Sequence, residues 1–307
     1  MAFGDTAKSR IAYIAESAFG TTPSTPTFKE LRRTSGGLET RKVTAVSGQV
    51  SLVRDIRQVV QLGQDVSGDI SFEFNNATFD DFLEAVLGGA WSTNVVKTGN
   101  NDKFFTFEET IVVGATSNYL RFLGCSIGAM SLNIGSRQMM TGSVSVMGKS
   151  QSATATSIIS GATYTSANTE SVFTADKVTS LSILGASPVV ESLQLSISQN
   201  MRVRPSVGTL YTDEFGKGAI TVTGSFRAFF ASGTLPDAIL NHTTGALSFT
   251  VGVDVNKKYT FSLPVIQITD GTTVLGGQGD DVMVNVNFQA VYDTSSSSTI
   301  SVTRLVA

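Results

Sequence analysis

The segment GDISFEFNNATFDDFLEAVLGGAW, residues 68–91, carries the pattern from which the fold can be predicted. In its first part Ile70, Phe72 and Phe74 alternate with polar residues, which is the two-residue period of a β-strand with one buried face. The same alternation recurs along the chain, for example in TGSVSVMG, LQLSISQ and VMVNVNFQAVY. One-sided burial of this kind is typical of antiparallel sheets with one face on a core and one face in water.

The second part of the segment predicts a short helix with its own start and stop signals. Thr78 is expected to cap the helix, with Asp81 at the third helical position completing a capping box. Gly88 and Gly89 are expected to end it. The apolar stripe, at spacing i, i+3, i+4 and i+7, consists of Phe79, Phe82, Leu83 and Val86.

A second helix with the same signals is predicted further along the chain. Thr234 and Asp237 repeat the spacing of Thr78 and Asp81 at an offset of 156 residues (234 − 78). This helix is expected to end at Gly245–Ala246. Each helix follows a strand that begins with glycine, and each of these strands follows a charged segment without strand periodicity. We interpret the repeated order as an internal duplication in which one helix per repeat covers the open face of a sheet.

The repeats divide the chain into four segments. Residues 1–40 are expected to form an extended N-terminal arm, because Pro23 and Pro26 favour extended backbone before them. The remaining segments are the first β repeat at 41–151, a Ser/Thr/Ala-rich linker or hairpin at 152–177, and the second β repeat at 178–307.

The composition argues against most kinds of chemistry. A formal charge of −3 over 307 residues does not suit a basic nucleic-acid binder. The single cysteine, Cys125, is expected to be a buried thiol, which excludes a disulfide-dependent fold. The single histidine, His242, leaves no zinc ligand set and no Ser–His or Cys–His pair. The turn GGQGDDV at 276–282 resembles a calcium loop only loosely. We therefore expect no enzyme, no metal and no cofactor.

The N-terminal region of the chain resembles a known family. The stretches AESAFGTTPSTPTFKELRRTSGGL, VSGQVSLVRDIRQVVQLGQDVSGDISFEF and FDDFLEAVLGGAW are similar to the major tail tube proteins of long-tailed bacteriophages. The likeness is specific over residues 12–91 and rests on pattern alone afterwards. It implies a duplicated tail-tube fold, with two β-sandwich or half-barrel repeats that each carry one flanking short α-helix.

The resemblance also implies a structural virion protein that polymerises as stacked rings into the hollow tail tube, the conduit for DNA ejection. Strands of neighbouring subunits would close one barrel around the lumen, which holds DNA and the tape measure protein. Since each chain has two repeats, a homotrimeric ring with pseudo-sixfold symmetry is expected, with a homohexamer as the alternative. Further expected partners are the tail terminator and distal tail proteins.

Two other functional classes fit the sequence less well. A β-rich phage or surface adhesin would expose clusters of aromatic residues, and an outer-membrane barrel needs a signal peptide and aromatic girdles. The N-terminus has no apolar signal segment, and no stretch approaches the length of a membrane helix. The sequence therefore predicts a protein of the virion tail, assembled in the host cytoplasm and without contact with a membrane.

The polar faces of the predicted strands are the candidate lumen-facing sites. They carry two acids and no base, as suits a duct in which a polyanion must slide without being held. The predicted lumen-facing residues are Asp69, Ser71, Glu73, Ser131, Asn133, Ser143, Ser145, Gln194, Ser196, Ser198, Thr221, Thr223, Ser225, Asn285, Asn287 and Gln289.

Two charged segments without strand periodicity, 44–66 and 202–217, are predicted to be loops. We expect them to be mobile in the free subunit and ordered against the next ring, with charges pairing across the interface. The predicted inter-ring residues are Arg54, Asp55, Arg57, Arg202, Arg204, Asp213, Glu214 and Lys217.

Overall fold

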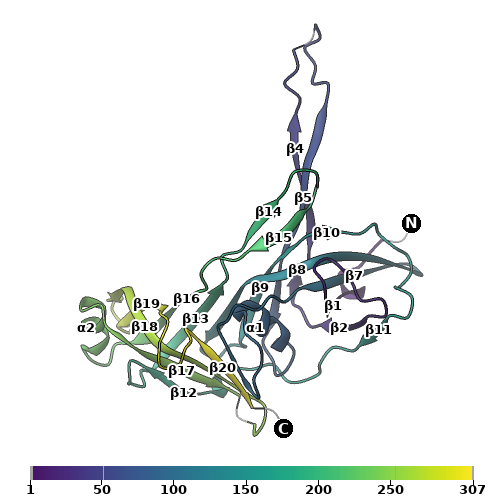
Figure 1. Cartoon of the computed structure of the whole chain (residues 1–307). Helices are drawn as coiled ribbons and strands as arrows, with labels where there is room; N and C mark the ends of the chain where they lie inside the picture. The colour runs from purple at the N-terminus through teal and green to yellow at the C-terminus, as the bar shows by residue number, and fades with distance from the viewer. Residues whose placement is uncertain (1–2, 51, 253, 306–307) are drawn as a thin grey trace.

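Strands make up most of the molecule, as the alternating pattern predicted (Figure 1). The computed structural model describes residues 3–50, 52–252 and 254–305. The first half of the chain contains η1 (Thr6–Lys8), β1 (Ser9–Ala15), β2 (Thr27–Leu31), β3 (Ser35–Gly36), β4 (Glu39–Val46), β5 (Val59–Glu73), α1 (Asp80–Leu87), β6 (Val95–Lys97), β7 (Phe105–Val113), β8 (Thr116–Gly135), β9 (Thr141–Gly148) and β10 (Ser150–Gln151). The second half contains β11 (Thr163–Thr165), η2 (Ala175–Lys177), β12 (Val178–Ile183), β13 (Val190–Ser198), β14 (Arg202–Pro205), β15 (Thr212–Gly216), β16 (Thr221–Phe229), α2 (Thr234–Leu240), β17 (Thr244–Val251), β18 (Lys258–Val274), β19 (Met283–Ala290) and β20 (Ser301–Leu305).

The main sheet crosses the whole molecule and is antiparallel throughout. Its strands follow one another in the order β4, β5, β9, β8, β13, β16, β19, β18. Two of these strands, β8 and β18, are long enough to pair with strands of a second layer as well. Each has a bulge, between Ile127 and Ala129 in β8 and between Ile268 and Asp270 in β18. Bulges bend a strand, and before its bulge β8 pairs with β7 while β18 pairs with β17.

The two halves of the chain pair their strands in the same order. The first half follows β1, β7, β8, β9, β5, β4. The second half follows β12, β17, β18, β19, β16, β13. A helix follows β5 in one half and β16 in the other. This correspondence is compatible with the predicted duplication, and the two halves meet where β8 pairs with β13.

The hydrophobic core lies beneath the main sheet and is rich in aromatic rings. Ile70 and Phe72 of β5 and Phe74 directly after it are fully buried, as their alternation predicted. Phe72 stacks on Phe79 with ring centroids 3.9 Å apart, and Phe74 contacts Tyr259 of the second half at 5.3 Å. The core is therefore continuous across both halves.

Helix α1 packs where the two halves meet. Its apolar side chains Phe82, Leu83 and Val86 are buried, and the helix contacts β8 and β13 on either side of the junction. The side-chain amide of Gln199, which follows β13, donates to the carbonyl of Ala85. Helix α2 takes the corresponding place in the second half, against β18 and β19. Each helix thus covers a sheet, as predicted.

The predicted capping roles of Thr78 and Thr234 are wrong. Helix α1 begins at Asp80 with Phe79 as its N-cap, α2 begins at Thr234 with Gly233 as its N-cap, and neither cap makes a side-chain hydrogen bond. The Thr78 hydroxyl is buried and has no hydrogen-bond partner in the described structure. The predicted end at Gly245–Ala246 is also wrong, because α2 stops at Leu240 and these residues belong to β17. Gly88 does end α1, in the left-handed conformation.

The acids of helix α1 bind other segments of the chain. Asp80 accepts hydrogen bonds from Tyr259 (2.5 Å) and Arg304 (2.5 Å), both from the second half. Asp81 binds the N-terminal strands and the segment after the helix through Tyr13 (3.1 Å), Lys29 (2.6 Å) and Lys103 (2.8 Å). Asp237, predicted as the counterpart of Asp81, is exposed on α2.

The segment 1–40, expected to be an extended arm, contributes strands to this chain's own fold. β1 pairs with β7 along its whole length and also with β2, and Ile11 and Tyr13 are buried. Segment 152–177, predicted to be a linker or hairpin, runs along the molecule as a connection. Its β11 pairs in parallel with β2, and Phe173 is buried in the core.

Candidate functional site

The predicted polar residues lie on one face of the main sheet. The strand registers place them in rows that cross from β5 to β19. One row is Ser71, Ser143, Ser131, Ser196, Thr223 and Gln289. The next is Glu73, Thr141, Asn133, Gln194, Ser225 and Asn287. A third row is Asp69, Ser145, Ala129, Ser198 and Thr221. Outside these rows, Asn285 of β19 lies opposite Arg227 of β16. The residues between them in each strand face the core, so the sheet has one continuous polar face.

Hydroxyl groups dominate this polar face. Ser131 and Ser143 share a hydrogen bond of 2.9 Å, and the Ser145 hydroxyl donates to Asp69. A depression with a volume of about 320 Å³ lies over β13, β16 and β19, lined by Ser196, Thr223 and their neighbours. The sheet is therefore hollowed on its polar side.

The polar face also carries charges that sequence reasoning missed. Arg227 follows Ser225 on the same side of β16 and forms a 3.1 Å ion pair with Glu191. The face therefore does contain a base, which was overlooked because the polar face of that strand was followed only as far as Ser225. By strand register Asp270 also lies on this face, opposite Asn287. At the other end, Glu39, Arg41 and Asp65 lie on the same side of β4 and β5. Across these strands the acids outnumber the bases.

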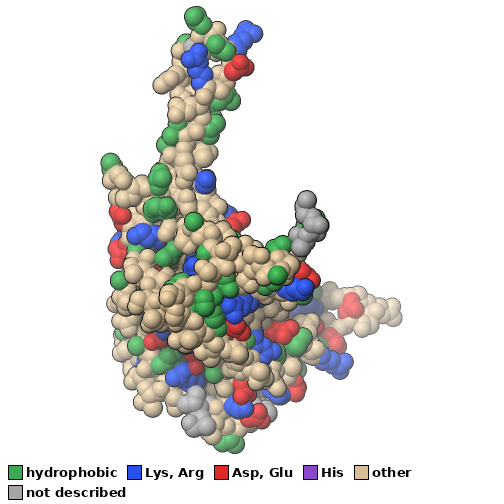
Figure 2. Space-filling view, turned by 90° about the vertical axis from the view of Figure 1, so that its right-hand side faces the viewer, with side chains coloured by type: hydrophobic (Ala, Val, Ile, Leu, Met, Phe, Trp, Pro, Cys, Tyr) green, Lys and Arg blue, Asp and Glu red, His purple; other side chains and the backbone are tan. Residues whose placement is uncertain are grey.

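A long hairpin projects from the end of the main sheet. It is formed by β4, β5 and the described residues between them, and it stands clear of the rest of the molecule (Figure 1). We call residues 43–62 the arm. Apolar side chains lie exposed along it, as Figure 2 shows. They are Val43, Val46, Val50, Leu52, Val53, Ile56, Val59, Val60 and Leu62. Arg54, Asp55 and Arg57 lie exposed near its tip.

A second hairpin, β14–β15, lies beside the base of the arm. The Gln64 amide donates to the Leu210 carbonyl at 2.8 Å, which joins the two hairpins. Both segments predicted to be loops therefore contain strands, and this part of the prediction is wrong. Most of their apolar residues are exposed, and of those that the structure describes only Val66 and Phe215 are buried. The usual alternation between buried and exposed positions is therefore largely missing.

Most of the predicted charges of the second hairpin are paired within the chain. Arg204 pairs with Glu214 across the hairpin at 2.8 Å, and Lys217 pairs with Asp102 at 2.7 Å. Arg202 lies opposite Gly216 in the ladder, and Asp213 is exposed.

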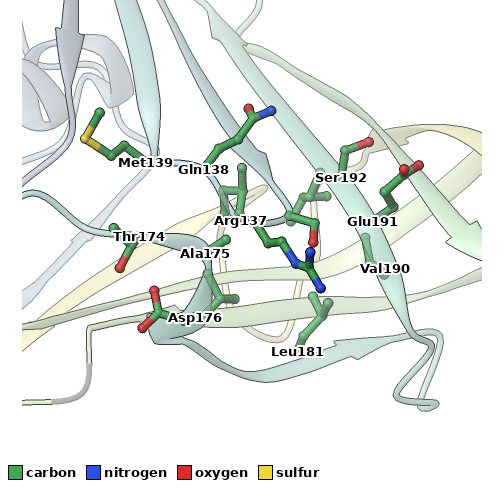
Figure 3. A pocket seen from close by; sticks show the side chains of 14 residues that line it. Arg137, Gln138, Met139, Thr174, Ala175, Asp176, Leu181, Val190, Glu191 and Ser192 are labelled. Carbon is green, nitrogen blue, oxygen red and sulfur yellow. The ribbon is translucent and has the colours of Figure 1, made fainter.

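A groove lies at the end of the sheet opposite the arm. It has a volume of about 570 Å³ and is lined by the turn after β8, the segment around η2 and the start of β13. In Figure 3 Arg137 lies at the centre of the lining, with Asp176 and Glu191 on either side. This groove combines apolar side chains with a few charges.

The described parts of the chain contain no cluster of His, Cys, Asp and Glu that could hold a metal ion. Cys125 is buried as predicted, and burial raises the pKa of its thiol well above the usual range, which makes it a poor nucleophile. His242 is exposed beyond the end of α2. The turn at 276–282 is closed by Asp280, which accepts a hydrogen bond from the Gly277 amide at 2.8 Å.

The chain thus combines a polar, hollowed sheet face with a projecting arm that exposes apolar side chains. Comparison with protein families identifies it: the model described as phage tail tube protein matches residues 6–290. The chain belongs to the phage tail tube protein family. No curated protein matches the chain.

The family match spans both halves of this tail tube protein. It starts just before β1 and ends with β19, so the N-terminal strands and both strand repeats belong to the family's common part. Family membership makes the chain a structural component of the phage tail, which assembles with itself and with other tail proteins. Among the residues that the structure describes, no helix is long and apolar enough to cross a membrane.

Proposed function

We propose that this tail tube protein forms rings that stack helically into a hollow tube, and that DNA passes through the tube during ejection. The observation that carries the proposal is the continuous polar face, which crosses every strand of the main sheet from β5 to β19. A monomer has no evident need for one uninterrupted, hollowed face of serine, threonine and asparagine. A barrel built from several such sheets would present that face to its lumen.

The charge of this face suits the passage of DNA. Each phosphate that pairs with Lys or Arg adds salt-dependent affinity, so a duct lined with bases would hold DNA. The two arginines of the face each have an acidic partner, Arg41 with Glu39 at 2.6 Å and Arg227 with Glu191 at 3.1 Å. Because acids outnumber bases on the face, DNA would be weakly repelled. Before ejection the same lumen would hold the tape measure protein.

The repeated strand order favours a homotrimeric ring. Each chain contributes two sheets of equivalent topology, β4–β5–β9–β8 and β13–β16–β19–β18. Three chains would therefore give a ring of pseudo-sixfold symmetry. A homohexamer remains the alternative. The tail terminator and distal tail proteins would bind the two ends of the tube, which would be assembled in the host cytoplasm.

The arm is proposed to make the contact between rings. Leu52 and Ile56 are 106% and 71% exposed, and monomeric proteins rarely leave so much apolar surface uncovered. The arm and the groove around Arg137 lie at opposite ends of the strands, because β5 runs from Val59 in the arm to Glu73 opposite Thr141. When rings stack in one direction, the arm of one ring would lie against the facing end of the next.

Electron microscopy and native mass spectrometry of the purified chain test this proposal. Rings and tubes are expected, with a ring mass of three chains. A ring mass of six chains would instead support the homohexamer. Dispersed monomers at every concentration and salt would contradict tube assembly and favour the adhesin alternative.

A further inference from the structure

The main sheet has an open edge at each end. Among the residues that the structure describes, β3 and β4 pair only with β5. At the other end, residues 270–274 of β18 pair only with β19, because β17 and β20 pair with the earlier part of β18 and the Ile268 N–H donates to the Thr243 carbonyl. Unpaired edges of this kind are ready to accept another strand.

The chain already contains a junction between two equivalent edges. Where the halves meet, β8 pairs with β13, with Ala129 opposite Ser198, Ser131 opposite Ser196 and Gly135 opposite Ser192. In the common strand order β18 corresponds to β8, and β4 corresponds to β13. The two open edges are therefore the same pair of edges that join inside the chain.

The registers give the correspondence residue by residue on the β18 side. β9 spans 141–148 and β19 spans 283–290, so the two match at an offset of 142 residues (283 − 141). Ser145 of β9 lies opposite Ala129, and Asn287 of β19 lies opposite Asp270. Asp270 therefore takes the place of Ala129. The bulge before each of these residues agrees with the assignment.

The other edge can be matched in the same way. The helices, α1 and α2, and the strands before them, β5 and β16, correspond at an offset of 156 residues (229 − 73 at the strand ends). Asp65 of β5 then matches Thr221 of β16. Arg41 lies opposite Asp65, and Ser198 lies opposite Thr221. Arg41 therefore takes the place of Ser198.

We propose that residues 270–276 of one subunit pair antiparallel with residues 35–41 of the next, in the register of the internal β8–β13 junction. Arg41 then lies opposite Asp270 of the neighbouring copy, and Glu39 lies opposite Thr272. The inference rests on the proposed ring and specifies how its subunits join. Because the two edges differ, the contact is head-to-tail, and repeated head-to-tail contacts form a ring when the rotation between copies closes.

Two further features of the edges fit this register. Opposite charges directly across an antiparallel pair are stabilising, and the register brings the guanidinium of Arg41 to the carboxylate of Asp270, where the internal junction has Ser198 and Ala129. Leu275 is 77% exposed in the single chain. It takes the place of Ile134, which packs against the core at the internal junction.

Two amides of these edges are already satisfied within the single chain. The Leu38 N–H donates to the Glu109 carboxylate at 2.7 Å, and the Gly271 N–H donates to the Asp270 carboxylate at 2.7 Å. The ladder would add its hydrogen bonds at the remaining positions, and the Gly271 N–H would exchange its partner for a carbonyl of the neighbouring copy.

Paired cysteines test the register directly. Arg41→Cys combined with Asp270→Cys should form a disulfide between subunits on oxidation of assembled rings, giving covalent oligomers on a denaturing gel. Arg41→Cys with Thr272→Cys, two residues out of register, is the matched control and should give at least about fivefold less product, because disulfides need Cβ atoms roughly 4 Å apart. Cys125 is fully buried and should not interfere.

Charge reversal supplies an independent measurement. Arg41→Asp and Asp270→Arg should each lower the ring fraction several-fold in native mass spectrometry, and the double variant should restore it. A double variant no better than either single one would overturn the Arg41–Asp270 pairing. Rings that form normally but cross-link only in the control pair would overturn the register while leaving the proposed ring intact. A wild-type chain that never forms rings would instead refute the proposed function.

Discussion

At the residue scale, the adjacent acids Asp80 and Asp81 show what a sequence pattern can and cannot predict. Their position at the start of a helix was predictable, since acids are favoured there. Their partners were not, because Arg304 and Tyr259 lie more than half the chain away from Asp80. Thr78 was also misread. Its place in the sequence suited a cap, but the helix begins two residues later, at Asp80.

Asp81 should make the fold sensitive to acid. Burial disfavours its charged form, but hydrogen bonds from Lys103 and Lys29 outweigh burial and lower its pKa to about 2. A carboxylate with a lowered pKa contributes stability that is present above the unfolded pKa near 4 and is lost as the pH falls towards 2. Asp81→Asn should therefore cost about 2 kcal/mol at pH 7, and less at pH 2.

Urea unfolding of the wild-type chain and of Asp81→Asn, at pH 7 and at pH 2.5, measures this loss of stability. The exposed acid Asp55 lies on the arm, and Asp55→Asn is the matched control, which should leave stability nearly unchanged at both values. If Asp81→Asn lost as much stability at pH 2.5 as at pH 7, the carboxylate would not be the source of the effect.

At the scale of elements, the strands of the main sheet were predictable because one face of each strand is buried in this chain. Ile70, Phe72 and Phe74 alternate with polar residues for that reason. The arm lacks such alternation, since Val43, Val59 and Leu62 are all exposed. An element whose apolar side chains lie exposed on both faces gives no burial period in the sequence, and so it was mistaken for a loop.

The arm should be dispensable for folding and needed for stacking. Replacing Val50, Leu52 and Ile56 by serine removes exposed side chains only, so the unfolding free energy should change by less than about 0.5 kcal/mol. Tube formation should fall strongly, because each buried CH₂ group contributes roughly 0.8 kcal/mol to an apolar contact. Electron microscopy should show single rings and few tubes.

Leu240→Ser is the matched control for this experiment, since Leu240 is 82% exposed but lies on α2, away from the arm. It should leave tube length unchanged. Tubes of normal length from the triple serine variant would show that the arm does not join the rings.

At the scale of the whole molecule, the sequence predicted two helices, two sets of strands and their relation to each other. It could not predict the pairing of β8 with β13, because that junction joins residues that are far apart in the chain and depends on how the two halves dock. The polar rows became visible only with this junction. Arg227 and Asp270 then emerged as members of the polar face, through strand register rather than sequence spacing.

Lysines on the polar face should slow the passage of DNA. Thr223 and Asn287 are exposed in neighbouring strands of this face, so Thr223→Lys and Asn287→Lys should fold and assemble normally. In a tube each lysine would recur in every subunit and every ring, and the summed contacts with phosphate would retard DNA. Virions of these variants should have normal tails but eject DNA at least about threefold more slowly at low salt, with recovery at high salt. Leu240→Lys, on the opposite side of the sheet, should eject normally. Normal ejection by the Thr223 and Asn287 variants at low salt would show that this face does not line the passage.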